Sequence, residues 1–181
     1  MDRRSFTKNT FLAGLGIANF SNIGIQNSPK AYKYNLKYAP HLGMFRNLAG
    51  NDPIDQLNYM ADLGFKAFED NGMRERDKKL QLKMSSTMRK RGIEMGVFVA
   101  HKIYWQKPVL ASGDPNYRDE FLDDIKKSVE VAKRVDAKWM TVVPGYVDLK
   151  LNISYQTANV IETLKRASSL LEPHGLTMVL E

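Results

Sequence analysis

The sequence predicts an α/β fold in which short buried strands alternate with amphipathic helices. Five apolar runs carry this prediction, and each of the first four is followed by a segment with helical periodicity. The last run, 176–181, follows a glycine and is apolar enough for a strand covered on both faces. Such repeats build either an open parallel sheet or a (β/α)8 barrel, whose functional side chains lie at the C-terminal ends of the strands.

The length of the chain leaves both architectures open. With 181 residues, 43% of them hydrophobic, it can bury a sizeable core in one domain. A (β/α)8 barrel usually needs about 250 residues, so five strands would form only its N-terminal part. An open sheet of flavodoxin-like order fits the length as it stands. Because the sequence stops at Glu181, where a strand is expected to end, we expect the chain to be the front part of a longer protein.

The first half of the folded part is expected to hold two strand–helix units. Strands are predicted at 33–40 and 65–70. Asp52 is suited to cap the helix between them, because its side chain can accept free N–H groups of the first turn, and Gly64 is suited to end that helix. A basic helix is expected to follow over about 74–91.

The second half repeats the pattern with longer helices. Apolar residues at helical spacing predict helices over about 116–135 and 154–171. Short apolar runs predict strands over 93–100, 139–143 and 176–181. We see no linker that would divide this part into two domains.

Charge and cysteine content narrow the possible functions. The chain has no cysteine, which excludes disulfides, thiolate nucleophiles and zinc sites built from cysteine. Its formal charge is +7, of which +3 lies in residues 1–30 and therefore +4 in the remainder. Solvated helix faces account for most of this excess, so charge alone does not identify a partner. No apolar stretch is long enough to span a bilayer.

Residues 1–32 have the features of an export signal. Arg3 and Arg4 precede a moderately apolar run over 10–20, and a phenylalanine stands two positions after the arginine pair. This pattern resembles a bacterial twin-arginine signal, with an ordinary basic N-terminus as the alternative. We therefore expect residues 1–32 to be a signal peptide and spacer, read by the twin-arginine export machinery. The protein would be periplasmic, with residues 33–181 forming the folded domain.

Polar side chains gather at the expected C-terminal ends of the strands. These are His41, Glu69, His101, Tyr146 and Glu181. If the strands are parallel, these side chains converge on one face, where carboxylates and imidazoles suit a divalent metal that polarises a carbonyl or alkoxide. The alternatives are a structural role for each histidine and a salt bridge for Glu69.

The loop 103–115 carries two aromatic residues, Tyr104 and Trp105, close behind His101. Aromatic side chains on such a loop can wall a sugar pocket, and a small hydrophobic cluster under the loop is the alternative. The chain has no glycine-rich phosphate loop, no Ser-His-Asp order and no H-E-x-x-H helix. These absences leave the strand ends as the candidate site.

Three segments resemble the hydroxypyruvate isomerase-like group of the xylose isomerase-like TIM barrels, which includes sugar isomerases and ketose 3-epimerases. They are 63–69 (LGFKAFE), 139–145 (WMTVVPG) and 171–181 (LEPHGLTMVLE). The resemblance covers about residues 33–181 and implies a (β/α)8 TIM barrel, of which this chain is the N-terminal part, truncated at strand five. The later metal ligands and the second catalytic glutamate of that group lie on strands six to eight.

The resemblance also implies an activity. In that group the glutamate ending strand five is a metal ligand and an acid/base residue, and Glu181 occupies this place. The implied reaction is an isomerisation or epimerisation in which glutamate moves a proton next to a carbonyl, while a divalent Mn, Mg, Co or Zn ion holds the substrate oxygens. Glu69, His101 and Trp105 would then bind the small sugar or hydroxy-carbonyl substrate. An oligomer is compatible with the sequence.

Two other functions remain open. The same superfamily contains endonuclease IV-like, metal-dependent enzymes for abasic DNA, which would place basic residues along the rim of the strand-end face. In this chain the basic residues concentrate in the helix expected at 74–91, so we expect no nucleic-acid partner. The second alternative is a sugar-binding barrel without catalysis or metal.

Overall fold

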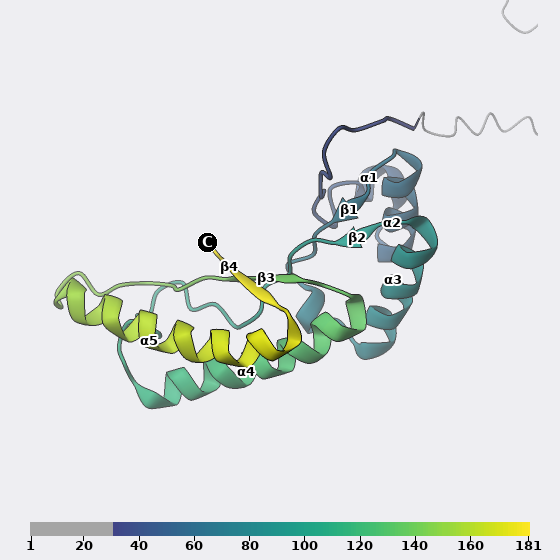
Figure 1. Ribbon diagram of the computed structural model, residues 1–181. Helices are drawn as coiled ribbons and strands as arrows, with labels where there is room; N and C mark the ends of the chain where they lie inside the picture. Colours follow the sequence, from purple (N-terminus) through teal and green to yellow (C-terminus); the bar gives the residue numbers. More distant parts are fainter. Residues whose placement is uncertain (1–30) are drawn as a thin grey trace, which may run out of the picture.

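The computed structural model describes residues 31–181, so most of the predicted signal, residues 1–30, lies outside the described residues. Within this range no helix is both long and apolar enough to cross a bilayer. Figure 1 shows the elements, which are α1 (Arg46–Ala49), α2 (Pro53–Asp62), β1 (Ala67–Phe68), η1 (Met73–Glu75), α3 (Lys78–Arg91), β2 (Glu94–Met95), α4 (Pro115–Val135), β3 (Trp139–Val142), α5 (Ile153–Leu171), η2 (Glu172–His174) and β4 (Thr177–Leu180).

The strands are parallel and follow one another in chain order. β1 pairs with β2, and β3 pairs with β4. Single parallel bridges join His41 to Glu69, and Val99 to Thr141. The five predicted strand positions therefore lie side by side in sequential order, as in an arc of a barrel. A flavodoxin-like sheet would place the first strand between the second and the third. The barrel prediction is thus confirmed, and the open sheet is excluded.

Local side-chain chemistry sets the ends of α2. The Asp52 carboxylate accepts the N–H of Ile54 at 2.7 Å, and Pro53 takes the first helical position, where a backbone N–H would lack a partner. Gly64 follows the helix with φ +96°, and a β-carbon there would lie 2.0 Å from the backbone oxygen of Tyr32. Only glycine fits this close approach. Both predicted helix ends are confirmed.

The prediction of a strand at 33–40 is wrong. Hydrogen bonds of the ladder type occur only around His41: the Pro40 carbonyl accepts the N–H of Glu69 at 3.0 Å, and the N–H of Leu42 donates to the Glu69 carbonyl at 2.9 Å. The rest of the segment contributes side chains instead, and the ring of Tyr34 stacks on that of Phe65 with centroids 4.7 Å apart. The first strand is therefore reduced to one bridge.

The helix expected from about residue 74 begins four residues later. Asp77 caps α3 by accepting the N–H of Leu80 at 2.9 Å, which fixes Lys78 as its first residue. The residues before the cap form the separate 3-10 helix η1, whose Met73 is fully buried. The predicted end of α3 is confirmed, because Gly92 adopts the left-handed conformation with φ 65°.

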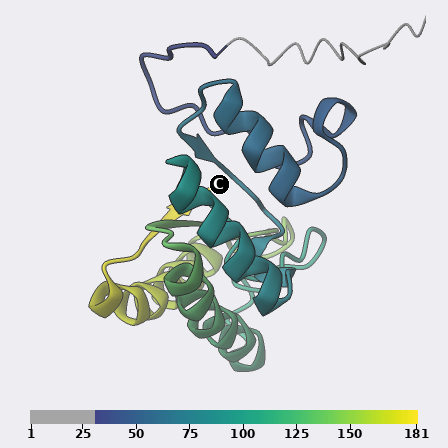
Figure 2. The same ribbon diagram turned by 90° about the vertical axis from the view of Figure 1, so that its right-hand side faces the viewer.

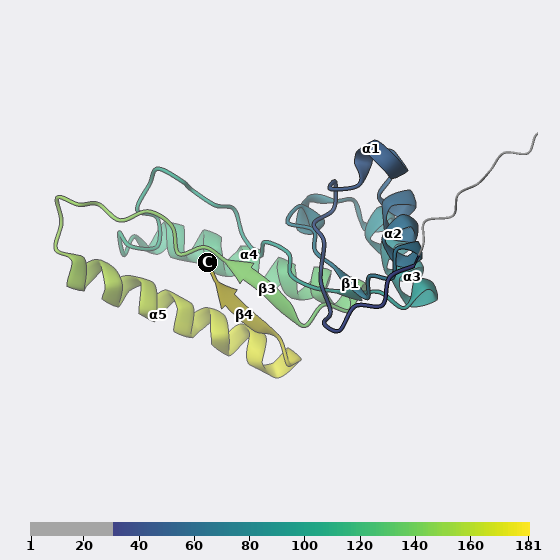
Figure 3. The same cartoon turned by 90° about the horizontal axis from the view of Figure 1, so that it is seen from above.

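The core lies between the strands and a layer of helices. Figures 1 and 3 show α4 and α5 side by side along one face of β3 and β4, and Figure 2 shows α3 on the outside of the molecule. Met140 and Val142 of β3 are fully buried under this layer. Phe68 of β1 is also fully buried, in the same cluster as Leu57 of α2 and Met84 of α3. The helices thus cover one face of the arc.

The expectation that 176–181 is covered on both faces is wrong for the described residues. Leu180 is 58% exposed and Val179 is 37% exposed, although Met178 packs against the core. Among residues 31–181, β4 pairs only with β3, so it forms an edge of the arc. A strand is buried on both faces only where neighbours and helices lie on both sides.

Candidate functional site

The first strand end holds Glu69 beside His41. The two residues form a parallel bridge, and Glu69 is half-buried. Phe68, the preceding residue, is fully buried in the core under the helices. Because successive side chains of a strand point to opposite faces, Glu69 is directed to the face away from the helices. This is the position that the sequence predicts for a substrate-binding group.

His101 ends the stretch after β2 and is only 6% exposed. Its Nε2 lies 3.1 Å from the backbone N of Val143 and therefore accepts that N–H. Its Nδ1 lies 2.9 Å from the carbonyl oxygen of Lys102, so Nδ1 carries the proton and donates it. The ring of Phe121 contacts the imidazole edge to face, with centroids 4.9 Å apart. His101 thus joins the ends of two neighbouring strands through Nε2, while Nδ1 bonds to the next residue of its own segment.

Burial lowers the pKa of His101 below its ordinary value. Desolvation disfavours the cation, and the nearby Asp124 carboxylate only partly opposes this effect. The neutral imidazole is also the only form that can accept the Val143 N–H at Nε2. His101 is therefore a neutral residue with its hydrogen bonds satisfied by the backbone.

An ion pair that the sequence analysis missed supports this strand end. Arg74 lies 2.7 Å from Asp124, and the two side chains are only 16% and 13% exposed. The second oxygen of Asp124 accepts the backbone N–H of Lys102 at 2.9 Å. One carboxylate on α4 thus fixes both the loop after β1 and the residue next to His101. No sequence pattern pairs residues 50 positions apart, so only the tertiary structure could show this contact.

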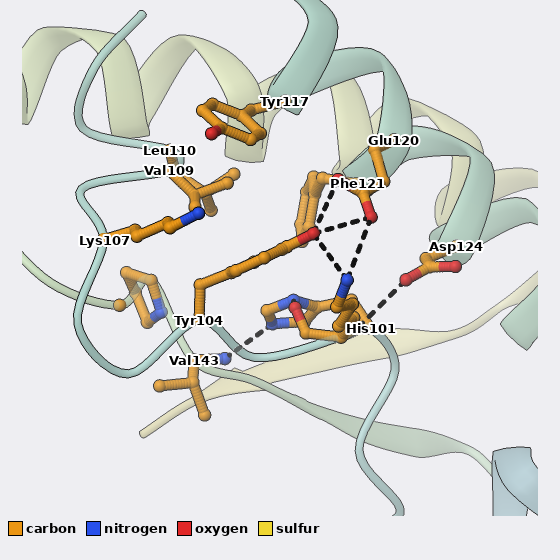
Figure 4. Close-up of a pocket in the computed structure, with 13 residues that line it drawn as sticks. His101, Tyr104, Lys107, Val109, Leu110, Tyr117, Glu120, Phe121, Asp124 and Val143 are labelled. Carbon is orange, nitrogen blue, oxygen red and sulfur yellow. Dashed lines mark hydrogen bonds and ion pairs between the residues drawn. The ribbon is translucent and has the colours of Figure 1, made fainter. Parts of the chain in front are cut away.

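A pocket lined by side chains of both elements lies between the loop 103–115 and α4 (Figure 4). The hydroxyl of Tyr104 sits in it, 2.7 Å from Nζ of Lys102 and 2.9 Å from the Glu120 carboxylate. Of the two aromatic residues predicted on the loop, Tyr104 lines this pocket, together with Tyr117 and Phe121, and Trp105 does not. Trp105 is 71% exposed and does not line it, so its predicted contact with a sugar has no support from its present position.

Glu181 follows β4 and extends its ladder. Its N–H donates to the Val142 carbonyl at 3.2 Å, and its side chain is exposed. Met178 packs against the core, so alternation directs Val179 and Glu181 to the opposite face, away from the helices. Glu69 and Glu181 therefore lie on the same face of the arc, at the C-terminal ends of their strands. This geometry agrees with the place predicted for a reacting carboxylate.

A sequence model of the family described as "xylose isomerase-like TIM barrel" matches residues 57–181, more than half of the chain. The chain belongs to this family. A search of curated protein sequences finds no match. The family explains the parallel strands in sequential order and the helices along one face.

Solved structures of this fold resemble the chain at low sequence identity. One is an AP endonuclease, family 2, from Brucella melitensis, with 17% identity, TM-score 0.62, and coverage of 80% of this chain and 54% of that chain. Another is D-psicose 3-epimerase with D-tagatose from Clostridium cellulolyticum H10, with 14% identity, TM-score 0.63, and coverage of 80% and 52%. A third is an IolI protein with a zinc atom, with 16% identity, TM-score 0.56, and coverage of 70% and 44%.

These likenesses concern the fold alone, and the chain spans about half the length of the structures it matches. Within residues 31–181 no group of three His, Asp or Glu side chains could hold a metal ion. The described residues therefore do not form the metal site that the family resemblance implies. Glu181 is a carboxylate of the right type for a hard cation, but it stands without partner ligands in this part of the chain.

Proposed function

We propose that the intact protein is a sugar isomerase or epimerase, of the hydroxypyruvate isomerase-like kind, that transfers a proton next to a carbonyl. The observation that carries this proposal is the position of Glu181. Its carboxylate projects from the C-terminal end of β4 on the face away from the helices, where barrels of this architecture place their reacting groups. Membership of the xylose isomerase-like TIM barrel family adds support.

In this proposal Glu181 is the base that removes the proton. Its side chain is exposed, so the carboxylate is open to a bound substrate from which it could take the proton. Glu69, on the same face, would accept hydrogen bonds from substrate hydroxyl groups. His101 would contribute indirectly, because its nitrogens are engaged by the backbone and can only fix the neighbouring loop. Trp105 would reach a sugar only if the loop 103–115 turned its exposed ring inward.

A divalent metal is part of the proposal for the intact protein. Support comes from the IolI protein, whose structure was solved with a zinc atom. Residues 31–181 hold no complete metal site, and within them Glu181 is the residue that would contribute a carboxylate ligand. Removal of metal from the intact protein with a chelator should abolish turnover, and added Mn, Mg, Co or Zn should restore it.

The proposal is tested by proton exchange in the intact protein. Incubation with small ketoses, aldoses or hydroxypyruvate in D2O should replace the proton next to the carbonyl by deuterium, which NMR detects for isomerases and epimerases alike. Glu181→Gln should lower the exchange rate at least about a hundredfold, the low end for loss of a general base. Glu172→Gln, an exposed glutamate in the same segment, serves as the matched control.

Near-normal exchange by Glu181→Gln on a substrate that the parent converts would show that Glu181 is only a structural strand end. Sugar binding without any exchange in the parent would favour the non-catalytic barrel instead. Cleavage of abasic DNA would favour the endonuclease alternative. That alternative has less support, because the basic residues cluster on α3, at the flank of the arc and away from the strand ends.

Export through the twin-arginine machinery to the periplasm is a separate proposal. It depends on Arg3, Arg4 and the apolar run over 10–20, which all lie outside the described residues.

A further inference from the structure

The helix α3 carries an exposed basic face, which the proposed function does not use. Its 14 residues, KKLQLKMSSTMRKR, include six lysines and arginines and no acidic residue. Lys79, Lys83 and Lys90 are exposed and fall at spacings of four and seven residues, which places them on one side of the helix. They extend over about 16 Å along the helix axis. Leu82, 48% exposed, lies beside this row.

The charge of this face is not neutralised by neighbouring residues. Lys78, Lys79, Lys83 and Lys90 form no ion pair with any residue between 31 and 181. In contrast, α4 contains both acidic and basic residues, several of which pair with one another. Lys78 and Lys79 also occupy the first turn of α3, where the helix dipole disfavours a cation. The helix dipole therefore does not account for the two lysines of the first turn, although it favours Lys90 in the last turn.

The start of the described chain lies at the same side of the molecule. The N–H of Tyr32 donates to the carbonyl of Leu63 at 2.9 Å, directly after α2. Asp62, at the end of α2, forms an ion pair with Arg91, the last residue of α3. Tyr32, near the start of the described chain, thus lies next to one end of the basic face.

We propose that the exposed face of α3 binds a membrane surface rich in anionic lipid. The face is a straight row of unpaired cations, which complements a plane of lipid phosphates, and Leu82 can enter the headgroup region. A nucleic acid is less well matched, because a DNA-processing site would need its cations at the strand ends, and α3 lies on the flank (Figure 2).

The test is sedimentation of the full chain with vesicles of phosphatidylglycerol and phosphatidylcholine, compared with vesicles of phosphatidylcholine alone. The triple variant Lys79→Gln, Lys83→Gln, Lys90→Gln should lose about a hundredfold in affinity for the anionic vesicles, since each cation near such a surface contributes about fivefold. High salt should also weaken binding of the unmodified protein to the anionic vesicles. The matched control is Lys126→Gln, Lys150→Gln, Lys165→Gln, which removes equal charge from exposed positions outside α3.

The control should bind anionic vesicles nearly as tightly as the parent. Equal losses in both triple variants would mean that only net charge matters, and this would overturn the assignment to α3. The proposal would also be overturned if the protein bound neutral vesicles as tightly as anionic ones and the α3 variant bound both unchanged. Membrane binding would then be assigned to the apolar run over 10–20. Tighter binding to a short DNA duplex than to anionic vesicles, lost in the α3 variant, would assign the face to nucleic acid instead.

Discussion

His101 offers a direct test of how the strand ends are held together. We consider His101→Phe in the intact protein, because phenylalanine keeps a ring of similar size against Phe121 but has no nitrogen. The variant removes the acceptor of the Val143 N–H and the donor to the Lys102 carbonyl. Lys102 is exposed, so water can replace the lost donor there. Val143 is half-buried, and its N–H is left without a partner.

The expected loss of stability follows from this one group. An unsatisfied, partly buried donor costs about 1–3 kcal/mol, and the retained ring contact avoids a further penalty for a cavity. Urea unfolding at pH 7.5 should therefore show a free energy of unfolding lower by about 1–3 kcal/mol. The matched control is His174→Asn, an exposed position on η2, which should change little.

The pH dependence gives a second and sharper readout. Burial lowers the pKa of His101 in the folded protein, so the folded state binds this proton more weakly than the unfolded state does. Stability should therefore be highest above the unfolded value of about 6.5 and fall as the pH drops through it. His101→Phe should lack this part of the decline, whereas His174→Asn should keep it. An unchanged decline in His101→Phe would refute the assignment of a buried, neutral His101.

Three further outcomes are expected. Asp124→Asn should lower the free energy of unfolding in urea by roughly 3 kcal/mol, the low end for a broken buried ion pair, because Arg74 keeps Glu75 as a second partner. The control is Asp123→Asn at an exposed neighbouring position, and equal effects of the two variants would contradict this reasoning. Glu69→Gln should lower proton exchange less than Glu181→Gln, since its proposed role is to orient the substrate; a larger loss would reverse the two roles. Replacing Arg3 and Arg4 together by Lys should hold the protein in the cytoplasm, and unchanged periplasmic accumulation on cell fractionation would exclude twin-arginine export.

The sequence by itself determined the features that depend on near neighbours along the chain. Asp52 starts α2 because its carboxylate reaches an N–H two residues away, and Gly92 ends α3 because it tolerates φ 65°. Periodicity located the helices α4 and α5 to within one residue at each end. The order of strands was also predicted, since a repeated strand–helix unit with a family resemblance leaves few topologies. Asp77 is a local signal of the same kind, because its carboxylate reaches an N–H three residues away, and it places the start of α3 later than the predicted residue 74.

The tertiary structure decided what depends on residues far apart in the chain. The segment 33–40 has strand-like residues, but only the surroundings of His41 find a ladder partner in Glu69. The burial of 176–181 was overestimated because burial depends on neighbours on both sides, which residues 31–181 do not supply.

The same distinction applies to the candidate site. The residue types at the strand ends could be listed from the sequence, and their direction to one face follows from parallel strands with alternating side chains. The groups that these side chains contact could not be predicted from the sequence. His101 was expected to face a substrate, yet both of its nitrogens are held by backbone groups, one of them 42 positions away. Arg74 and Asp124 gave no signal at all, because an ion pair across 50 residues is set by how the loop after β1 packs on α4, and no local pattern encodes that distance.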